Sequence, residues 1–322
     1  MVIVCGVLTG LNKGAFKHCG NLMSIIVSEN NSSYISVDGI LYNKNKSKII
    51  VASKAIQGAI TVSDSVTSID EYAFYNCAGL TSIVIPDGVT TIDYGAFCDS
   101  GLMSVTIGNS VTSIGYEAFS GCTKLTSVTI PDSITSIGNY AFYECTGLMS
   151  VTIGNSVTSI GDSAFEYCHK LVEVYNKSTL SITTGSSSDG YIAYYAKNVY
   201  KNEGGSKLTT DENGYVIYTD GDEKILVAYL GTNAELVLPS NITKIYKYAF
   251  YNCTGLTSVT IGNSVTSIGE YAFRGCTGLT SITFNGTVAQ WNAIAKGKDW
   301  NMDVPSTCKI VCIDGTVSVG RV

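Results

Sequence analysis

One phrase recurs along the chain, and it constrains the fold more than any other feature. SVTSIDEYAFYNCAGLTSIVI, residues 65–85, returns as SVTSIGEYAFRGCTGLTSITF at residues 264–284, and edited copies begin at Ser110, Ser133, Ser156 and Asn241. The pair Ala-Phe occurs eight times, and neighbouring copies within a block are 22 or 23 residues apart. A unit of this length buries its apolar side only by stacking on similar units. The sequence therefore predicts a repeat solenoid.

Each step of one copy has a structural interpretation. Leu-Thr-Ser-Val-Thr-Ile alternates apolar and polar residues, which predicts a short strand with Val and Ile inside and Ser and Thr outside. A turn at Pro-Asp-Ser or Gly-Asn-Ser follows, and then Val-Thr-Ser-Ile as a second straight segment. Gly-x-x-Ala-Phe-x-x-Cys has roughly helical spacing. The prediction is a mainly β solenoid of roughly ten coils, counting partial ones, with parallel strands and short helical turns.

The cysteines follow the same period. Seven of the eleven lie three residues after a Phe: Cys19, Cys77, Cys122, Cys145, Cys168, Cys253 and Cys276. The chain has no CxxC and only two histidines, so a zinc site lacks its usual spacing. We expect small buried hydrophobic residues; the alternatives are a few disulfides or a reactive thiol. A Cys/His dyad at His18–Cys19 or Cys168–His169 is conceivable, but it would use a cysteine from the buried ladder.

The motif I-P-D-S-V-T-S-I-G-x-x-A-F-x-x-C-x-x-L resembles the BspA-type leucine-rich repeat family, known mainly from bacterial surface proteins. The resemblance covers residues 8–27, 60–175 and 236–284. It implies a right-handed superhelix exposed outside the cell, and adhesion to host extracellular proteins, other microbes or cell surfaces. It names no ligand, because the repeated positions are core positions.

We expect a single solenoid over residues 1–322, interrupted twice. Tyr42 to Val51 and Tyr218 to Val227 have the same spacing around a polar turn, which predicts a β-hairpin in each interruption. The opening MVIVCGVLTGLNKGAF lacks the basic region of a signal peptide, and we interpret the chain as a fragment or a processed form. The expected segments are a truncated first repeat (1–35), a hairpin insertion (36–59), central repeats (60–175), a Tyr-rich helix and hairpin insertion (176–235), C-terminal repeats (236–284) and a C-terminal cap (285–322).

The cap has its own pattern. TVAQWNAIAKGKDW places Val288, Trp291 and Ile294 on one face of a predicted helix, and CKIVCIDGTVSV alternates like a strand. Cys308 and Cys312, four residues apart on an extended strand, would have Cα atoms about 13 Å apart. That distance is too long for a disulfide between them.

The second interruption contains a candidate binding segment, residues 181–212. Asp189 could cap a short helix running to Tyr200, with the apolar face Ile192, Tyr195, Ala196 and Val199. Tyr191 and Tyr194 would then be exposed, and the position of Tyr200 is left open. Tyrosine offers a large amphipathic contact area and is enriched at interfaces, so these three tyrosines are candidate ligand contacts. The alternative is that the helix only covers the break in the repeats.

The outward faces of the strands provide the other candidates. Small hydroxyl side chains should form rows at Ser104 and Thr106, Ser127 and Thr129, Ser150 and Thr152, and Ser258 and Thr260. Ser127, Thr129, Ser150 and Thr152 are the candidate ligand contacts. Three interpretations remain open: ordinary solvent-facing strand residues, a weakly charged surface for a protein or glycan, and an ice-binding plane.

Composition and motifs exclude several function classes. Charged residues make up 14% and the net charge is −6, with no cluster of Lys or Arg, which argues against nucleic acid as a partner. No apolar run approaches the roughly 20 residues that span a bilayer. We find no phosphate loop, HExxH or GxSxG, and DENGYVIYTDGDE resembles a calcium loop only in composition. We therefore expect no enzyme, cofactor or metal.

The expected role is a recognition or adhesion module, secreted or on the cell surface, that binds an extracellular protein or glycan. The alternative is a structural spacer that displays another domain of a larger surface protein.

Overall fold

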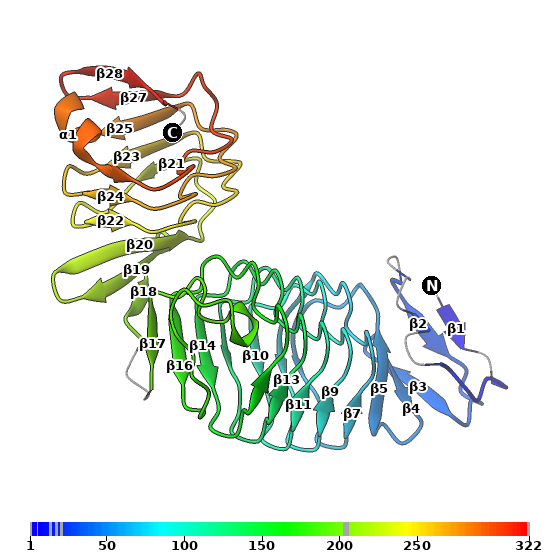
Figure 1. Ribbon diagram of the computed structural model, residues 1–322. Helices are drawn as coiled ribbons and strands as arrows, with labels where there is room; N and C mark the ends of the chain where they lie inside the picture. Colours follow the sequence, from blue (N-terminus) through cyan, green and yellow to red (C-terminus); the bar gives the residue numbers. More distant parts are fainter. Residues whose placement is uncertain are drawn as a thin grey trace. The chain divides into compact units, whose positions relative to one another are not determined.

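The computed structural model describes residues 2–4, 6–12, 15–16, 19, 22–201 and 206–320. The chain forms two compact units, unit 1 (Met1–Gly204) and unit 2 (Gly205–Val322). In each unit, strands of successive coils pair in parallel, as Figure 1 shows. The parallel-strand solenoid of about ten turns that the repeats predict is confirmed.

The coils of unit 1 contribute longer strands and, in five of them, a two-residue strand. The longer strands are β6 (Gly58–Thr61), β8 (Leu80–Val84), β10 (Ser104–Thr106), β12 (Ser127–Thr129), β14 (Ser150–Ile153), β16 (Glu173–Asn176) and β17 (Asn198–Tyr200). The short strands are β7 (Ser68–Ile69), β9 (Thr91–Ile92), β11 (Ser113–Ile114), β13 (Ser136–Ile137) and β15 (Ser159–Ile160). Repeat positions pair with themselves, for example Val128 with Val151, because the coils have nearly the same length.

Unit 2 repeats this plan. Its longer strands are β21 (Glu235–Val237), β23 (Ser258–Ile261) and β25 (Ser281–Phe284), and its short strands are β22 (Lys244–Ile245), β24 (Ser267–Ile268) and β26 (Ala295–Lys296). The C-terminal segment adds the predicted helix, α1 (Val288–Ala293), and the antiparallel pair β27 (Lys309–Cys312) and β28 (Gly315–Ser318). Trp291 of α1 is buried.

Antiparallel hairpins occur in both interruptions. In unit 1, β4 (Ile40–Asn43) pairs with β3 (Tyr34–Val37) and with β5 (Lys48–Ala52). In unit 2, β19 (Tyr215–Asp220) pairs with β18 (Leu208–Thr210) and with β20 (Glu223–Tyr229). The last strand of each set continues in parallel with the first short strand of the repeats, so the hairpins are part of the coil sheets. At the N-terminus, β1 (Val2–Val4) pairs with β2 (Ile25–Val27).

The segment with helical spacing is a run of turns and not a helix. Amides alternate between two kinds of acceptor: Phe97 N–H donates to the Ala118 carbonyl of the next coil at 2.8 Å, and Cys98 N–H donates to Gly95 within its own turn at 3.0 Å. Such turns use left-handed residues, among them Tyr72 (φ 58°) and Asn76 (φ 53°). Because of this geometry, the turns of one coil form backbone hydrogen bonds with the turns of the next coil, as paired strands do.

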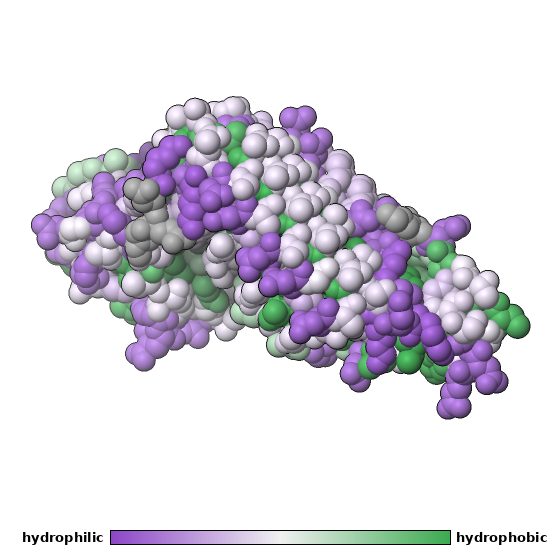
Figure 2. All heavy atoms as spheres, turned by 90° about the horizontal axis from the view of Figure 1, so that it is seen from below, coloured by the Kyte–Doolittle hydropathy of each residue, from purple (hydrophilic) through white to green (hydrophobic). Residues whose placement is uncertain are grey.

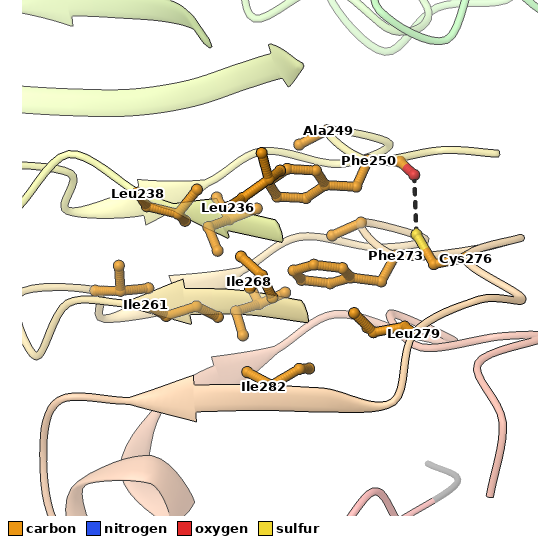
Figure 3. Packing of buried hydrophobic residues seen from close by; sticks show 14 of the residues in the cluster. Leu236, Leu238, Ala249, Phe250, Ile261, Ile268, Phe273, Cys276, Leu279 and Ile282 are labelled. Atoms are coloured by element: carbon orange, nitrogen blue, oxygen red, sulfur yellow. Dashed lines mark hydrogen bonds between the residues drawn. The ribbon is translucent and has the colours of Figure 1, made fainter. Parts of the chain in front are cut away.

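A ladder of phenylalanines fills the core. Phe74, Phe97, Phe119, Phe142 and Phe165 stack with ring centroids 5.0–5.2 Å apart, and Phe250 and Phe273 stack at 4.7 Å. Figure 3 shows this ladder in unit 2, where the Cys276 thiol donates to the Phe250 carbonyl at 3.1 Å. The Cys122, Cys145 and Cys168 thiols make the same bond at 3.2 Å. Two members of the predicted cysteine ladder differ, because Cys19 is exposed and Cys253 half-buried.

The helix predicted from Asp189 to Tyr200 is wrong. Only a 3-10 turn forms, η1 (Asp189–Tyr191), and residues 198–200 are strand β17, which pairs with β16. Ile192, Tyr195 and Ala196 are buried as the apolar spacing suggested. Pairing with an existing strand edge outweighed the weak helical pattern of so short a segment.

Candidate functional site

The hydroxyl side chains of the strands align in rows as expected. Ser127 pairs with Ser150 and Thr129 with Thr152, and in unit 2 Ser258 pairs with Ser281 and Thr260 with Thr283. Ser127 and Thr129 are exposed, while Ser150 and Thr152 are half-buried. These rows form the strand face of the coils.

The rows are short. Ser150 is followed by Glu173 and Thr152 by Tyr175 on β16, a strand that is buried along its whole length. In unit 2 the Thr260–Thr283 row ends at Val237 on one side and Val311 on the other. An ice-binding plane would need an uninterrupted array of hydroxyl groups. Among the residues that the structure describes, the short rows favour ordinary solvent-facing strand residues or a weakly charged surface for a protein or glycan.

The candidate tyrosines of the insertion separate onto two surfaces. Tyr200 lies on β17 and stacks on Tyr175 at 5.2 Å, which continues the row of Thr129 and Thr152 along the strand face. Tyr191 is half-buried and Tyr194 is 43% exposed; their rings meet edge-on at 5.4 Å, and Tyr194 also contacts Tyr195. Tyr191 and Tyr194 therefore belong to a different surface.

Tyr191 and Tyr194 end a continuous chain of ring contacts along unit 1, which we call the tyrosine stripe and in which Tyr72, His169 and Tyr195 are buried. Its neighbours are 4.9–5.8 Å apart between ring centroids. Tyr116 and Tyr167 are 38% and 39% exposed. In order, its rings are Tyr75, Tyr72, Tyr94, Tyr116, Tyr140, Tyr143, Tyr167, His169, Tyr195, Tyr194 and Tyr191.

Sequence reasoning missed the stripe because its members occupy different positions of the repeat. Tyr94 and Tyr116 lie three residues before the core Phe, Tyr140 two before it, Tyr143 one after it and Tyr167 two after it. Only the turns bring these positions to one side. The signal was the number of tyrosines, 21 in the chain, of which many flank the Ala-Phe pairs.

Carboxylates accompany the tyrosines of the stripe. Burial and the neighbouring Glu117, to which the phenol is also hydrogen-bonded, raise the pKa of Tyr116. Burial and the charges of Glu144 and Glu166 raise the pKa of Tyr143. The middle of the stripe is therefore an electronegative environment with protonated phenols.

The face of the molecule shown in Figure 2 is largely weakly polar. In Figure 2 most visible atoms have the pale colours of intermediate hydropathy, with strongly hydrophilic patches between them. This agrees with a chain in which only 14% of residues are charged.

A hollow of about 660 Å³ lies in unit 1 beside the first hairpin. Its walls include Ile25 of β2, Ile40 of β4 and Ile60 of β6, and its polar groups include Asp38 and Tyr42. Burial and the Asp38 charge raise the pKa of Tyr42, so the phenol remains a hydrogen-bond donor. The lining offers binding contacts without a nucleophile paired with a base.

The conceivable dyad at Cys168–His169 does not have the required chemistry. Burial raises the pKa of the Cys168 thiol well above its ordinary value, and the thiol donates to the Phe142 carbonyl. His169 is buried with its ring against Tyr167 and Tyr195. A thiolate nucleophile is disfavoured there. Cys19 is exposed, and His18 lies outside the described residues.

The acidic segment from Asp211 to Glu223 forms a turn, the strand β19 and a second turn. Asp211 accepts hydrogen bonds from the amides of Asn213 and Tyr215, and Asp220 pairs with Lys207 at 2.6 Å. Within the part of the chain that the structure describes, no group of three or more His, Cys, Asp or Glu could hold a metal ion. No helix among these residues is long and apolar enough to span a bilayer.

Comparison with protein families gives one match. The family described as BspA type leucine rich repeat region matches six copies, over residues 55–172 and 229–295, which is more than half of the chain. No curated protein matches the sequence.

Several solved structures are similar. A leucine rich cell surface protein from Faecalibacterium prausnitzii is 21% identical, with a TM-score of 0.41 over 83% of this chain and 99% of that one. A leucine-rich repeat protein from Bacteroides ovatus is also 21% identical, with a TM-score of 0.41 over 97% of this chain and 71% of that one. The pneumococcal vaccine antigen PcpA is 15% identical, with a TM-score of 0.36 over 88% of each chain.

Proposed function

The chain belongs to the BspA-type leucine-rich repeat family, and from this premise we propose that it is a non-catalytic recognition module of a cell-surface or secreted protein. Its partner is an extracellular protein or glycan. The proposal is supported by the family and by the buried, protonated thiol at Cys168, which disfavours a nucleophile beside His169.

The observation that carries the proposal is the tyrosine stripe. A solenoid core of Phe, Cys, Leu and Ile needs no aromatic rings outside it, yet unit 1 keeps Tyr116, Tyr167 and Tyr194 38–43% exposed. Exposed tyrosines offer large, rigid, amphipathic contact area at low entropic cost, which is why they are enriched at interfaces. The stripe also runs from the repeats to Tyr191 and Tyr194 of the 181–212 insertion, where a ligand was expected.

Binding of the whole chain to a panel of extracellular matrix proteins and surface glycans tests this role. Point variants suit the test, because deleting residues 181–212 would remove β17 and β18 from their sheets. We expect Tyr167→Ser with Tyr194→Ser to weaken saturable binding at least about tenfold. The matched variant on the strand face is Thr129→Lys with Thr152→Lys, which should bind as the wild type does.

Other outcomes would overturn this assignment. Loss of binding in the strand-face variant alone would move recognition to the hydroxyl rows. No binding by the wild type to any member of the panel would favour the spacer role. Circular dichroism and the urea unfolding midpoint of each variant establish that it is folded.

A further inference from the structure

The chain segment that supplies the middle of the tyrosine stripe is acidic. Between Tyr94 and Tyr167 the sequence has six acidic side chains and one basic side chain, Lys124. The charged groups that act on Tyr116 and Tyr143 are the carboxylates Glu117, Glu144 and Glu166. The six acidic residues are Asp99, Glu117, Asp132, Glu144, Asp162 and Glu166.

Unit 2 contains a tyrosine pair with a cation on it, and one of its members, Tyr251, occupies the repeat position of Tyr143. The guanidinium carbon of Arg274 lies 5.8 Å from the ring centroid of Tyr251 and 5.2 Å from that of Tyr271. At one end of the stripe in unit 1, the Lys54 ammonium lies 5.5 Å from the centroid of Tyr75. Cations at these distances are attracted by the negative face of the ring.

The repeat makes the comparison between units direct. Tyr251 follows Phe250, and Arg274 follows Phe273 one coil later. In unit 1, Tyr143 follows Phe142, and the residue after Phe165 one coil later is Glu166. The carboxylate of Glu166 therefore stands, next to Tyr143, at the repeat position that the guanidinium group of Arg274 has in unit 2.

We propose that the middle of the stripe binds an arginine-bearing segment of a partner protein, with a guanidinium group over Tyr143 and paired with Glu144 and Glu166. This rests on the proposed recognition function and specifies its partner. Arginine fits better than lysine because a planar guanidinium stacks on aromatic rings and pairs with carboxylates in a bidentate way. The half-buried Tyr143 and the exposed Tyr167 would form the floor.

The test uses the full chain and two labelled peptides, one of alternating Arg and Gly and one in which citrulline replaces every Arg. Citrulline keeps the shape and loses the charge. By fluorescence anisotropy at about 0.15 M salt, the wild type should bind the arginine peptide at least about tenfold more tightly than the citrulline peptide. Glu166→Arg should abolish this preference, because it supplies the internal cation that unit 2 has.

Arg274→Glu is the matched control in unit 2, and it should raise the affinity for the arginine peptide by exposing Tyr251 and Tyr271. Equal binding of the two wild-type peptides, or an unchanged preference in Glu166→Arg, would overturn the proposal. The extracellular panel separates it from the wider function. Suppose that an extracellular protein or glycan of the panel binds the wild type and Glu166→Arg equally well. The chain would then keep its recognition role, but the arginine site at Tyr143 would not take part in it.

Discussion

Phenylalanine and cysteine pack together in the core of most coils. The Phe rings stack face to face, 4.7–5.2 Å apart, so one ring per coil fills the space between neighbouring coils. The Cys is small enough to lie beside this stack, and its thiol donates to the Phe carbonyl of the coil before, as Cys145 does to Phe119. Serine would make a stronger hydrogen bond there but would bury a more polar group.

The buried thiols make stability depend on alkaline pH. Burial raises the pKa of Cys122 from 9.0 to about 12. In the unfolded chain this thiol ionises near its ordinary pKa, so above that pH the unfolded state binds fewer protons than the folded state. Stability should then fall as pH rises from about 9 to about 12, by up to about 1.4 kcal/mol per pH unit for each such thiol.

Urea unfolding at about pH 8, 9 and 10 measures this slope. Cys122→Ala removes one titrating group, so its unfolding free energy should fall less steeply with pH than that of the wild type. Parallel slopes in the two proteins would show that Cys122 contributes nothing to the pH dependence.

At the scale of the coil, close stacking selects glycine at some positions of the repeat and not at others. Gly255 and Gly278 occupy the same place in two CTGL segments. A Cβ on Gly278 would lie 2.5 Å from the Thr254 carbonyl oxygen of the coil before, whereas a Cβ on Gly255 would meet nothing within 4 Å. The same substitution should therefore have opposite consequences one coil apart.

We expect Gly278→Ala to destabilise unit 2 by about 1–3 kcal/mol, because the added methyl group overpacks the backbone. Gly255→Ala should be neutral or stabilising by less than about 1 kcal/mol, because alanine restricts the unfolded chain. Urea unfolding of the two variants compares them directly. Equal destabilisation of the two variants would show that the contact with Thr254 is not its cause.

The elements that repeat could be predicted from sequence, and those that depend on a single contact could not. The strands could be predicted because the alternation of apolar and polar residues, as at Val128 and Ile130, is a local signal. The turns were misread as helical because Phe and Cys three apart fit a helix as well as a run of turns. Turns form in place of a helix because amides such as that of Phe97 donate hydrogen bonds to carbonyls of the next coil.

The candidate site was predicted only in part for the same reason. The row of Thr129 and Thr152 followed from strand register, and the exposure of Tyr194 followed from the spacing in the insertion. The stripe joins tyrosines from several different positions of the repeat, so no single periodicity reveals it. Tyr143 and Tyr167 become neighbours, 5.2 Å apart, only after the turns have formed.

At the scale of the whole molecule, each unit contains its own core. In unit 2 one cluster runs from Tyr215 to Val319 and includes Phe250, Phe273 and Trp300. In unit 1 the Phe ladder from Phe74 to Phe165 has this role. A solenoid is stabilised by each coil and its nearest neighbours, so damage to one core should leave the other intact.

Differential scanning calorimetry should accordingly resolve two transitions. Phe119→Ala should lower the stability of unit 1 by about 3–5 kcal/mol through the cavity it leaves, and it should shift only one transition. Trp300→Ala should shift only the other. A single transition displaced by both variants would mean that the two units unfold as one.

The pairing of each repeat position with itself also affects how such a gene can change. Inserting or deleting one whole repeat would give the flanking coils equivalent neighbours in the same register, because equivalent strand positions pair from coil to coil. The tyrosine stripe has no such protection, because its rings come from several different positions of the repeat.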